Sequence, residues 1–290
     1  MKLPSVGDPP AALAGGSDRV YGPGMPAEAS TAAAPAATDG ALEARLDALA
    51  TRLDERRIAL EQRHDSRCVF TCAYVLITRR LARGLGTAGY EDPAWIVELA
   101  EKFAGLYFAA LDASAAGKPV GEAWSCVFDA IDRKHSSVLE DLVFSMTAHI
   151  VHDLPLALDQ LGATAATRSH VSDFHAVNRT MGAGIAEIED AISRRYAPWV
   201  RQLDQLGRPY SRILSNYGIR MSRGLAWYNA VRLADPASRA DAQASTERSV
   251  REFVDQLLHP PAWTLRTGLR LGRFIVGLLR RWPSDPRIET

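Results

Sequence analysis

The sequence predicts an all-α protein, with a single multi-helix, bundle-like domain behind a disordered N-terminal tail. Apolar residues recur in steps of three and four through most of the chain after residue 40, which is the spacing of one helix face. No segment alternates apolar and polar residues between hairpin turns, so no sheet is required. Residues 1–40 are dominated by Ala, Gly, Pro, Ser and Thr, and they lack the apolar surface that offsets chain entropy.

Changes in composition divide the chain. We expect a low-complexity tail at 1–40, a helical domain at 41–260, and a basic amphipathic C-terminal helix and tail at 261–290. No internal repeat with a period of about 20 to 50 residues is found. One helical domain is therefore the default expectation.

The helices of the first half follow from periodicity and end signals. Leucines three or four residues apart between positions 42 and 53 predict an amphipathic helix whose charged face is solvated. An apolar helix follows Arg67 and extends to about residue 83, and Asp92-Pro93 supplies an N-cap and a first-turn proline for the next helix. Further helices hold Trp124–Ile131 and 137–158. We expect the latter to be interrupted or kinked near Pro155, which removes one backbone donor.

The second half predicts three more helices. Apolar positions continue in unbroken steps from near 169–172 to about Tyr196, which indicates one long helix. Another follows Pro209, with Met221, Leu225 and Tyr228 in its apolar ridge. The third spans 240–258 and is stopped by Pro260-Pro261.

Charge and cysteine usage exclude several classes of partner. The chain has 34 basic and 34 acidic residues and a pI near 7.1, so no overall field steers it toward nucleic acid. Three cysteines without zinc-ribbon spacing make a disulfide framework an unfavourable interpretation and favour a reducing compartment. Since no secretory signal and no long charge-free apolar stretch is found, we expect a cytoplasmic protein.

Known catalytic motifs are also missing. The sequence has no glycine-rich phosphate loop after a strand, no Gly-x-Ser-x-Gly elbow and no kinase signature. Those enzyme classes are set aside, which leaves enzymatic activity an open question.

Five of the seven histidines lie between positions 135 and 175, and one of them shares a core-facing helix stripe with an aspartate. His149 and Asp153 are four residues apart and follow Val138, Leu142 and Met146 on that stripe. An imidazole and a carboxylate one turn apart can form a catalytic base with its orienting partner, or can bind a metal together. Equally, the two can satisfy each other as a structural buried pair.

A metal site needs more ligands than these two. His170 and Asp173, at the start of the next long helix, are the tentative additions to His149 and Asp153. Imidazole and carboxylate ligands suit a divalent metal such as zinc or iron. The strong helical zinc signature, with two histidines flanking a catalytic glutamate, is absent.

A second stripe lies beside the apolar ridge of the helix after Pro209. It carries Asn216, Arg220, Arg223 and Trp227 in steps of four, three and four. Aligned guanidinium groups can grip a carboxylate or phosphate of a substrate, with the indole packed beside it. The alternative is that they pair with acidic residues inside the bundle.

The C-terminal segment 264–282 contains five arginines, several large apolar residues and no acidic residue. Such a segment can dock on a membrane surface or on a protein partner. It can also be a final helix packed on the bundle, with arginines that extend to solvent. The sequence leaves both open.

Several short runs together resemble one family of helical proteins, domain-of-unknown-function family 5995. They are Tyr90–Trp95, Phe103–Tyr107, Ala123-Trp124 with Phe128-Asp129, Ala148–Ile150 with Asp153–Pro155, Asp173-Phe174 with Val177-Asn178, and Asn216–Arg220 with Arg223 and Ala226-Trp227. The likeness covers about residues 65–235. It implies a helical fold and a shared polar core around His149, Asp153, Asn216 and Arg220, but no established activity.

Two functions remain as expectations. The first is an all-helical enzyme in which His149 and Asp153 act on a small, mostly apolar, anion-bearing substrate, as a metal-dependent hydrolase or a proton-transfer or cyclisation catalyst. The arginine stripe holds its anionic group. The second is a non-catalytic binding or scaffold protein that docks on a membrane or partner through its basic C-terminal helix.

Overall fold

The structure is a computed structural model that describes residues 38–133, 136–162, 168–198 and 216–262. Beyond these it describes 267–268, 271–273, 275, 277 and 279–288. The predicted tail at 1–40 therefore lies almost wholly outside the described residues. Within them the chain is helical and has no strand, which confirms the predicted all-α class.

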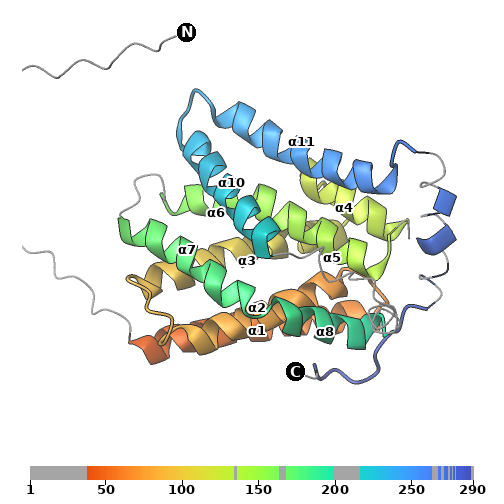
Figure 1. The fold of residues 1–290 in the computed structure, drawn as a ribbon, viewed down its shortest axis with the longest axis horizontal. Coiled ribbons are helices and arrows are strands. Elements are labelled where there is room, and N and C mark those ends of the chain that lie inside the picture. Colours follow the sequence, from red (N-terminus) through yellow and green to blue (C-terminus); the bar gives the residue numbers. More distant parts are fainter. Residues whose placement is uncertain are drawn as a thin grey trace, which may run out of the picture. The chain divides into compact units, whose positions relative to one another are not determined.

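Ten α-helices and one π-helix make up the described part of the chain (Figure 1). They are α1 (Asp39–Gln62), α2 (Cys68–Gly84), α3 (Pro93–Ala115), α4 (Glu122–Asp132), α5 (Val138–Thr147), η1 (Ala148–Asp153), α6 (Leu154–Gln160), α7 (Arg168–Gly182), α8 (Ile185–Tyr196), α10 (Asn216–Ala234) and α11 (Arg239–Leu258).

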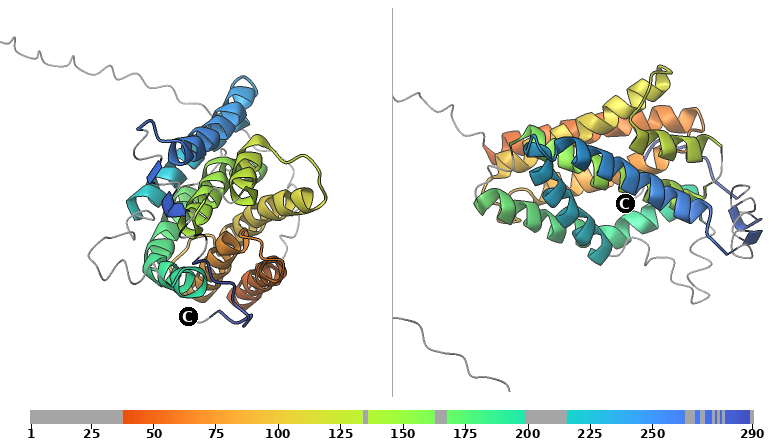
Figure 2. Two further views of the ribbon diagram at one scale, coloured as in Figure 1. Left: turned by 90° about the vertical axis from the view of Figure 1, so that its right-hand side faces the viewer. Right: turned by 90° about the horizontal axis from the view of Figure 1, so that it is seen from above.

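The continuous segment α5–η1–α6 is the centre of the helical packing. The π-helix η1 contacts α3, α4, α10 and α11 in addition to its two neighbours in the chain. Helices α1 and α2 pack side by side on one side of this segment, and α11 lies on the other (Figures 1 and 2). Every side chain of η1 except Val151 is buried, so its polar residues are enclosed by protein.

Two predicted helices are divided in the structure. The segment 137–158 changes to π-helix before Pro155, which lacks the N–H that would bond to the carbonyl four residues earlier. The predicted single helix from about 170 to Tyr196 is wrong, because it ends at Gly182 and restarts at Ile185. The Arg80 side chain packs against this break. Gly184 leaves space for it, since a Cβ at this position would lie 2.6 Å from the Arg80 Cδ.

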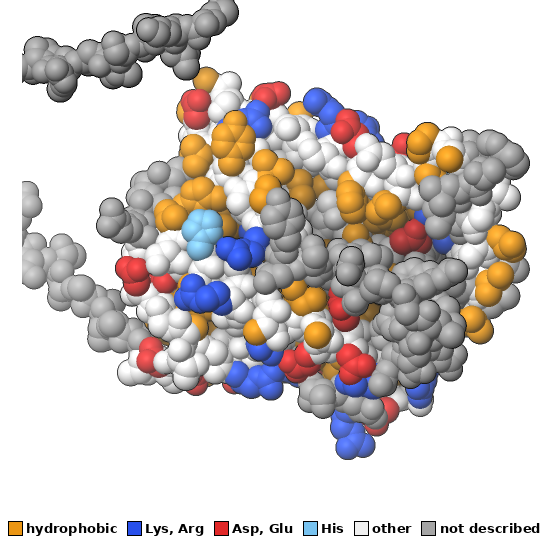
Figure 3. Space-filling view, in the orientation of Figure 1, with side chains coloured by type: hydrophobic (Ala, Val, Ile, Leu, Met, Phe, Trp, Pro, Cys, Tyr) orange, Lys and Arg blue, Asp and Glu red, His pale blue; other side chains and the backbone are white. Residues whose placement is uncertain are grey.

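Helix α10 is rotated relative to the prediction, so that its predicted apolar ridge faces solvent. Met221, Leu225 and Tyr228 are exposed, and Figure 3 shows hydrophobic side chains on the surface over this helix. The buried face instead carries Arg223 together with small residues such as Ala226. Small side chains let α10 approach α6 closely, and this packing decides the rotation of the helix.

The described C-terminal residues pack on the helical domain. Arg273 donates to Glu140 on α5 at 3.0 Å, and Arg280 donates to Asp141 at 2.5 Å. These contacts favour the docked alternative for the basic segment, because both charges are already paired with carboxylates. Leu271 is nevertheless 61% exposed. None of the described helices has the length and apolar character needed to cross a membrane.

Candidate functional site

His149 and Asp153 form a buried pair on the π-helix. The His149 Nδ1 lies 2.8 Å from the Asp153 Oδ2, and the two residues are 3% and 2% exposed. Trp124 on α4 donates its indole N–H to the same carboxylate, with Nε1 3.1 and 3.0 Å from its two oxygens. π-Helical turns are rare in proteins and occur often at functional sites. Because both side chains are buried, His149 and Asp153 face the protein interior together, as their spacing predicts.

Burial determines the protonation state of the His149 ring. Burial lowers the pKa of His149, although the hydrogen bond to Asp153 opposes the shift, so the imidazole is neutral at pH 7. Because an Asp153 oxygen accepts this hydrogen bond, Nδ1 carries the proton of the ring and donates it to Asp153. The Nε2 atom is then an acceptor, and it has no hydrogen-bond partner among the described residues.

Aromatic rings enclose the imidazole. Phe103 stacks on it with ring centroids 3.5 Å apart and planes 8° from parallel. Tyr74 meets it nearly edge-on, with centroids 4.9 Å apart. Phe70 adds an edge contact at 5.5 Å. This cage is what removes water from the His149 and Asp153 pair.

An apolar cavity of about 80 Å³ lies next to the cage. Side chains from α2, α3, η1, α6, α7 and α10 line it, among them Tyr74, Leu99, Phe103, Val177 and Arg223. Tyr74 and Phe103 thus form a shared wall, since both line the cavity and both contact the His149 ring. Neither His149 nor Asp153 belongs to the lining, so these rings separate the imidazole from Arg223.

Arg223 is a buried cation beside this cavity. Its side chain is 5% exposed, and its guanidinium lies over the Phe174 ring at 4.2 Å and donates to the Phe174 carbonyl at 3.0 Å. The Nε–H has no partner in the described part of the chain. Burial lowers the pKa of Arg223 to about 10, with little to offset it.

The other arginine of the cavity wall, Arg80, is paired with a carboxylate. Arg80 donates to Glu187 at 2.8 Å and to the Thr180 carbonyl at 2.9 Å. Its charge is therefore balanced by a carboxylate, whereas the structure gives Arg223 no carboxylate partner among the residues it describes. Arg223 is the cavity cation that remains able to pair with an anion.

The remaining members of the predicted arginine stripe do not join Arg223. Arg220 is exposed, because the edge of the buried face of α10 passes between these two positions. Trp227 packs on Phe174 with ring centroids 4.9 Å apart and does not line the cavity. The side chain of Asn216 lies outside what the structure describes.

His170 and Asp173 hold the start of α3. Asp173 accepts the backbone N–H groups of Glu91 and Asp92 at 2.8 and 2.7 Å, which occupies both of its oxygens. The His170 Nε2 lies 3.2 Å from Asp92 Oδ2, and its ring stacks on Trp95 at 4.6 Å.

The tentative metal set is therefore not assembled. No three or more His, Cys, Asp or Glu side chains of the described segments lie where they could hold one metal ion. The reason is that Asp173 is committed to a helix N-terminus, while His149 and Asp153 are enclosed by the aromatic cage.

Three residues of this region were not anticipated as site residues. Trp124, Tyr74 and Phe103 come from three different helices, and only packing brings them to His149. Helical periodicity marks each of them as apolar core, which gives no signal of a polar partner.

The chain can be compared with known protein families and structures. The sequence profile described as a family of unknown function, DUF5995, matches residues 46–260, well over half of the chain. The chain belongs to DUF5995. No curated protein and no solved structure matches the chain. The DUF5995 match confirms the family resemblance, and it spans η1, Arg223 and the cavity, while the segment after residue 260 lies outside it.

Proposed function

We propose that the protein binds a small, mostly apolar molecule with one anionic group in the cavity, and that Arg223 contacts this group. The observation that carries the proposal is a buried guanidinium with no carboxylate partner among the described residues, beside an apolar space. Ligand pockets are commonly apolar with a few polar groups that fix orientation. A buried charge without a partner is destabilising, so its presence calls for an explanation.

The chemistry of Arg223 favours a carboxylate. A guanidinium presents parallel N–H donors that match two carboxylate oxygens, and burial strengthens this hydrogen-bonded pair. The cavity volume is about 80 Å³. An engineered cavity of about 150 Å³ binds benzene, so this space suits a short chain.

The test uses two matched series of ligands. Isothermal titration calorimetry would measure the binding of straight-chain carboxylates from butanoate to octanoate and of the corresponding alcohols. We expect the carboxylates to bind and the alcohols to bind at least tenfold more weakly. Arg223→Gln should weaken carboxylate binding by about ten- to a hundredfold, the value of a charge-assisted hydrogen bond.

Arg220→Gln is the matched control. It removes one positive charge from the same helix at an exposed position, so carboxylate affinity should stay within about twofold of the original protein. If carboxylates and alcohols bind alike, or if both variants weaken binding equally, the role of Arg223 is refuted.

A second candidate function is acid–base catalysis on the bound molecule. The observation that favours it is the buried, unpartnered Nε2 of a neutral imidazole whose Nδ1 is held by Asp153. In an ester hydrolysis, Phe103 would have to move aside so that water and the ester reach Nε2. Water would then add to the acyl carbon while Nε2 takes its proton, and the imidazolium would return this proton to a leaving alkoxide, whereas a phenolate would leave as the anion. Asp153 would stabilise the imidazolium that forms.

Esters that carry a free carboxylate test this second function. The monomethyl esters of short dicarboxylic acids combine a short apolar chain, an anion for Arg223 and a small leaving group, and a pH-stat follows their hydrolysis. We expect turnover to fall at least a hundredfold in His149→Ala. Equal rates in the original protein and this variant, with ligand binding intact, would leave a binding protein in which the pair is structural.

A further inference from the structure

Two polar atoms, one on the shared wall and one on the His149 ring behind it, play no part in the binding of an anion by Arg223. The Tyr74 hydroxyl oxygen and the His149 Nε2 are both buried, and neither has a hydrogen-bond partner among the residues described. A buried polar group without a partner is destabilising, and each such group in a folded protein calls for an explanation. Two of them on contacting rings point to a shared cause.

The two rings lie against one another. Their centroids are 4.9 Å apart and their planes meet at 61°, and Tyr74 also lines the cavity that Arg223 borders. Two threonine hydroxyls of the cavity wall, by contrast, are satisfied within the protein. The Thr180 hydroxyl pairs with the Tyr90 hydroxyl at 3.0 Å, and the Thr78 hydroxyl donates to the Tyr74 carbonyl at 2.8 Å.

The unpartnered atoms are complementary in hydrogen bonding. His149 Nε2 is an acceptor, because the proton of the neutral ring is on Nδ1 and is donated to Asp153. Tyr74 is a donor, since burial raises its pKa well above the usual value and the hydroxyl keeps its proton. One acceptor and one donor on two contacting rings match a group that both donates and accepts.

We propose that Tyr74 and His149 form a second polar subsite at the inner wall of the cavity, and that it takes a hydroxyl group of the ligand. The hydroxyl donates to His149 Nε2 and accepts from the Tyr74 hydroxyl. The inference rests on the proposed function, in which Arg223 holds the anionic group. It names the ligand class as a short hydroxycarboxylate.

Other polar groups fit this subsite less well. A ketone or ether oxygen only accepts, so Nε2 would stay without a partner. A second carboxylate also only accepts, and it would bring an uncompensated negative charge into an apolar wall next to the Asp153 carboxylate. A hydroxyl satisfies both atoms while remaining neutral.

Phe103 controls access to this subsite. Its half-buried ring lines the cavity on one side and covers the imidazole on the other at 3.5 Å. In the structure it lies across the path to His149, so the ring turns aside when the hydroxyl enters. The inference requires that this turn opens the cavity toward His149.

The experiment compares ligands that differ by one hydroxyl. Isothermal titration calorimetry would measure the affinities of butanoate to octanoate and of their ω-hydroxy counterparts, 4-hydroxybutanoate to 8-hydroxyoctanoate. We expect one chain length at which the hydroxyl raises affinity about fivefold or more. Tyr74→Phe should abolish that gain, which is measured within the variant as the ratio of the affinities for the hydroxycarboxylate and its parent carboxylate.

Tyr90→Phe is the matched control. It removes a tyrosine hydroxyl that already has a protein partner, Thr180, and should keep the gain. A second readout follows His149 itself by ¹⁵N NMR. We expect the hydroxycarboxylate, but not the parent carboxylate, to shift the Nε2 resonance toward that of a hydrogen-bonded acceptor.

The outcomes separate this inference from the proposed function. Binding of parent carboxylates without a hydroxyl gain at any length overturns the second subsite and leaves the Arg223 site standing. A gain that survives in Tyr74→Phe has the same meaning. If neither series binds, the proposed function and this inference both fail.

Discussion

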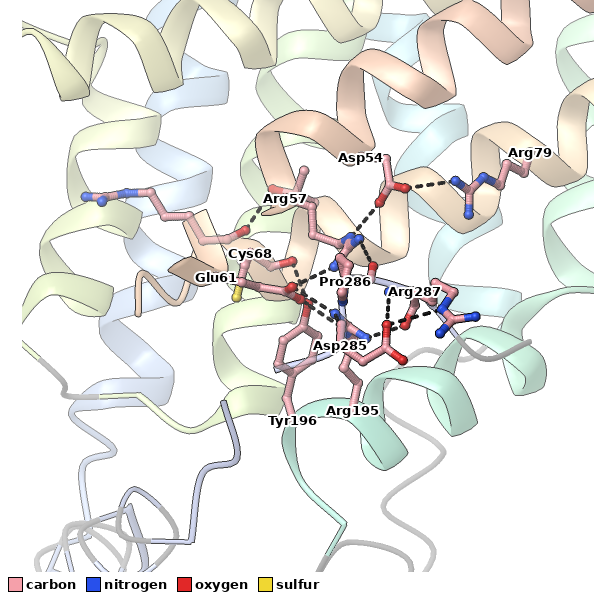
Figure 4. Close-up of polar contacts among 12 residues, drawn as sticks. Asp54, Arg57, Glu61, Cys68, Arg79, Arg195, Tyr196, Asp285, Pro286 and Arg287 are labelled. Carbon is pink, nitrogen blue, oxygen red and sulfur yellow. Dashed lines mark hydrogen bonds and ion pairs between the residues drawn. The ribbon is translucent and has the colours of Figure 1, made fainter. Parts of the chain in front are cut away.

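Two regions of this protein bury arginine in opposite ways. Near the C-terminal segment, Arg57 is 0% exposed and pairs with Asp54 and Glu61, both at 2.6 Å (Figure 4). Arg195 reaches the same Glu61 carboxylate at 2.8 Å, and the Pro286 carbonyl accepts from Arg57. In the cavity wall, the described residues give Arg223 only the Phe174 carbonyl and ring.

The pKa shifts of these arginines differ in sign. Burial alone would lower the pKa of Arg57, but its hydrogen bond to Asp54 and the charge of Glu61 outweigh burial and raise it. For Arg223, burial lowers the pKa, and no carboxylate among the described residues opposes this shift. Paired buried charges hold helices together, whereas an unpaired one is stabilised by an anion from outside the chain.

The largest effect is expected from breaking the paired region. Glu61→Gln keeps the shape of the side chain and removes the charge that Arg57 and Arg195 share. We expect the free energy of unfolding to fall by about 3–5 kcal/mol, because buried Arg195 loses its carboxylate partner and buried Arg57 loses one of its two. Urea denaturation measures it. A loss below about 1 kcal/mol would mean that solvent already screens this cluster.

Removal of the unpaired charge in the cavity wall should instead raise the free energy of unfolding. Arg223→Met removes a buried cation and keeps an apolar side chain of similar length, so the ligand-free protein should gain about 1–2 kcal/mol of stability. The same variant should lose carboxylate binding. Arg220→Met serves as its control and should change stability by less than about 0.5 kcal/mol. Strong destabilisation of Arg223→Met would assign Arg223 a structural role.

The buried histidine gives a smaller effect that depends on pH. Because the pKa of His149 is lowered in the folded state, the unfolded chain binds a proton near the ordinary value of 6.5 while the folded protein does not. Stability should therefore fall as pH drops below about 6.5, by up to about 1.4 kcal/mol per pH unit.

His149→Asn should reduce this slope, since asparagine can still donate to Asp153 but does not titrate. The change should be seen in thermal unfolding between pH 7 and 5. His175→Asn, at an exposed position on α7, is the control. An identical slope in the original protein and in His149→Asn would show that other groups produce the pH dependence.

The smallest effect is expected for a pair that is ionic but exposed. Arg56 and Asp112 are 2.5 Å apart, with side chains 47% and 53% exposed. Arg56→Gln should cost less than about 1 kcal/mol in urea denaturation, because solvent screens the pair. A loss as large as that of Glu61→Gln would contradict the view that burial makes the difference.

Part of the candidate site could be predicted from the sequence. The spacing of His149 and Asp153 places them one turn apart on the inner face, and residues four apart remain neighbours in the π-helical turn that the structure has. Their partner Trp124 could not be predicted in the same way. It lies 29 residues from Asp153 along the chain, and no local rule connects two helices across that distance.

Local sequence determined which segments are helical. The start of α3 shows why, since the Asp92 side chain accepts the Trp95 backbone N–H at 3.0 Å, as its place before Pro93 predicts. Spacing, caps and proline act within one or two turns, so they can be read without knowing the fold.

Only the tertiary structure decided which face of each helix is buried where the sequence offers two. Helix α10 exposes Met221 and Leu225 and buries Arg223, because its small residues fit against α6. The division of α7 from α8 follows in the same way from the approach of Arg80 to Gly184. Such choices depend on contacts between distant segments, whose energies are set by packing rather than by local propensity.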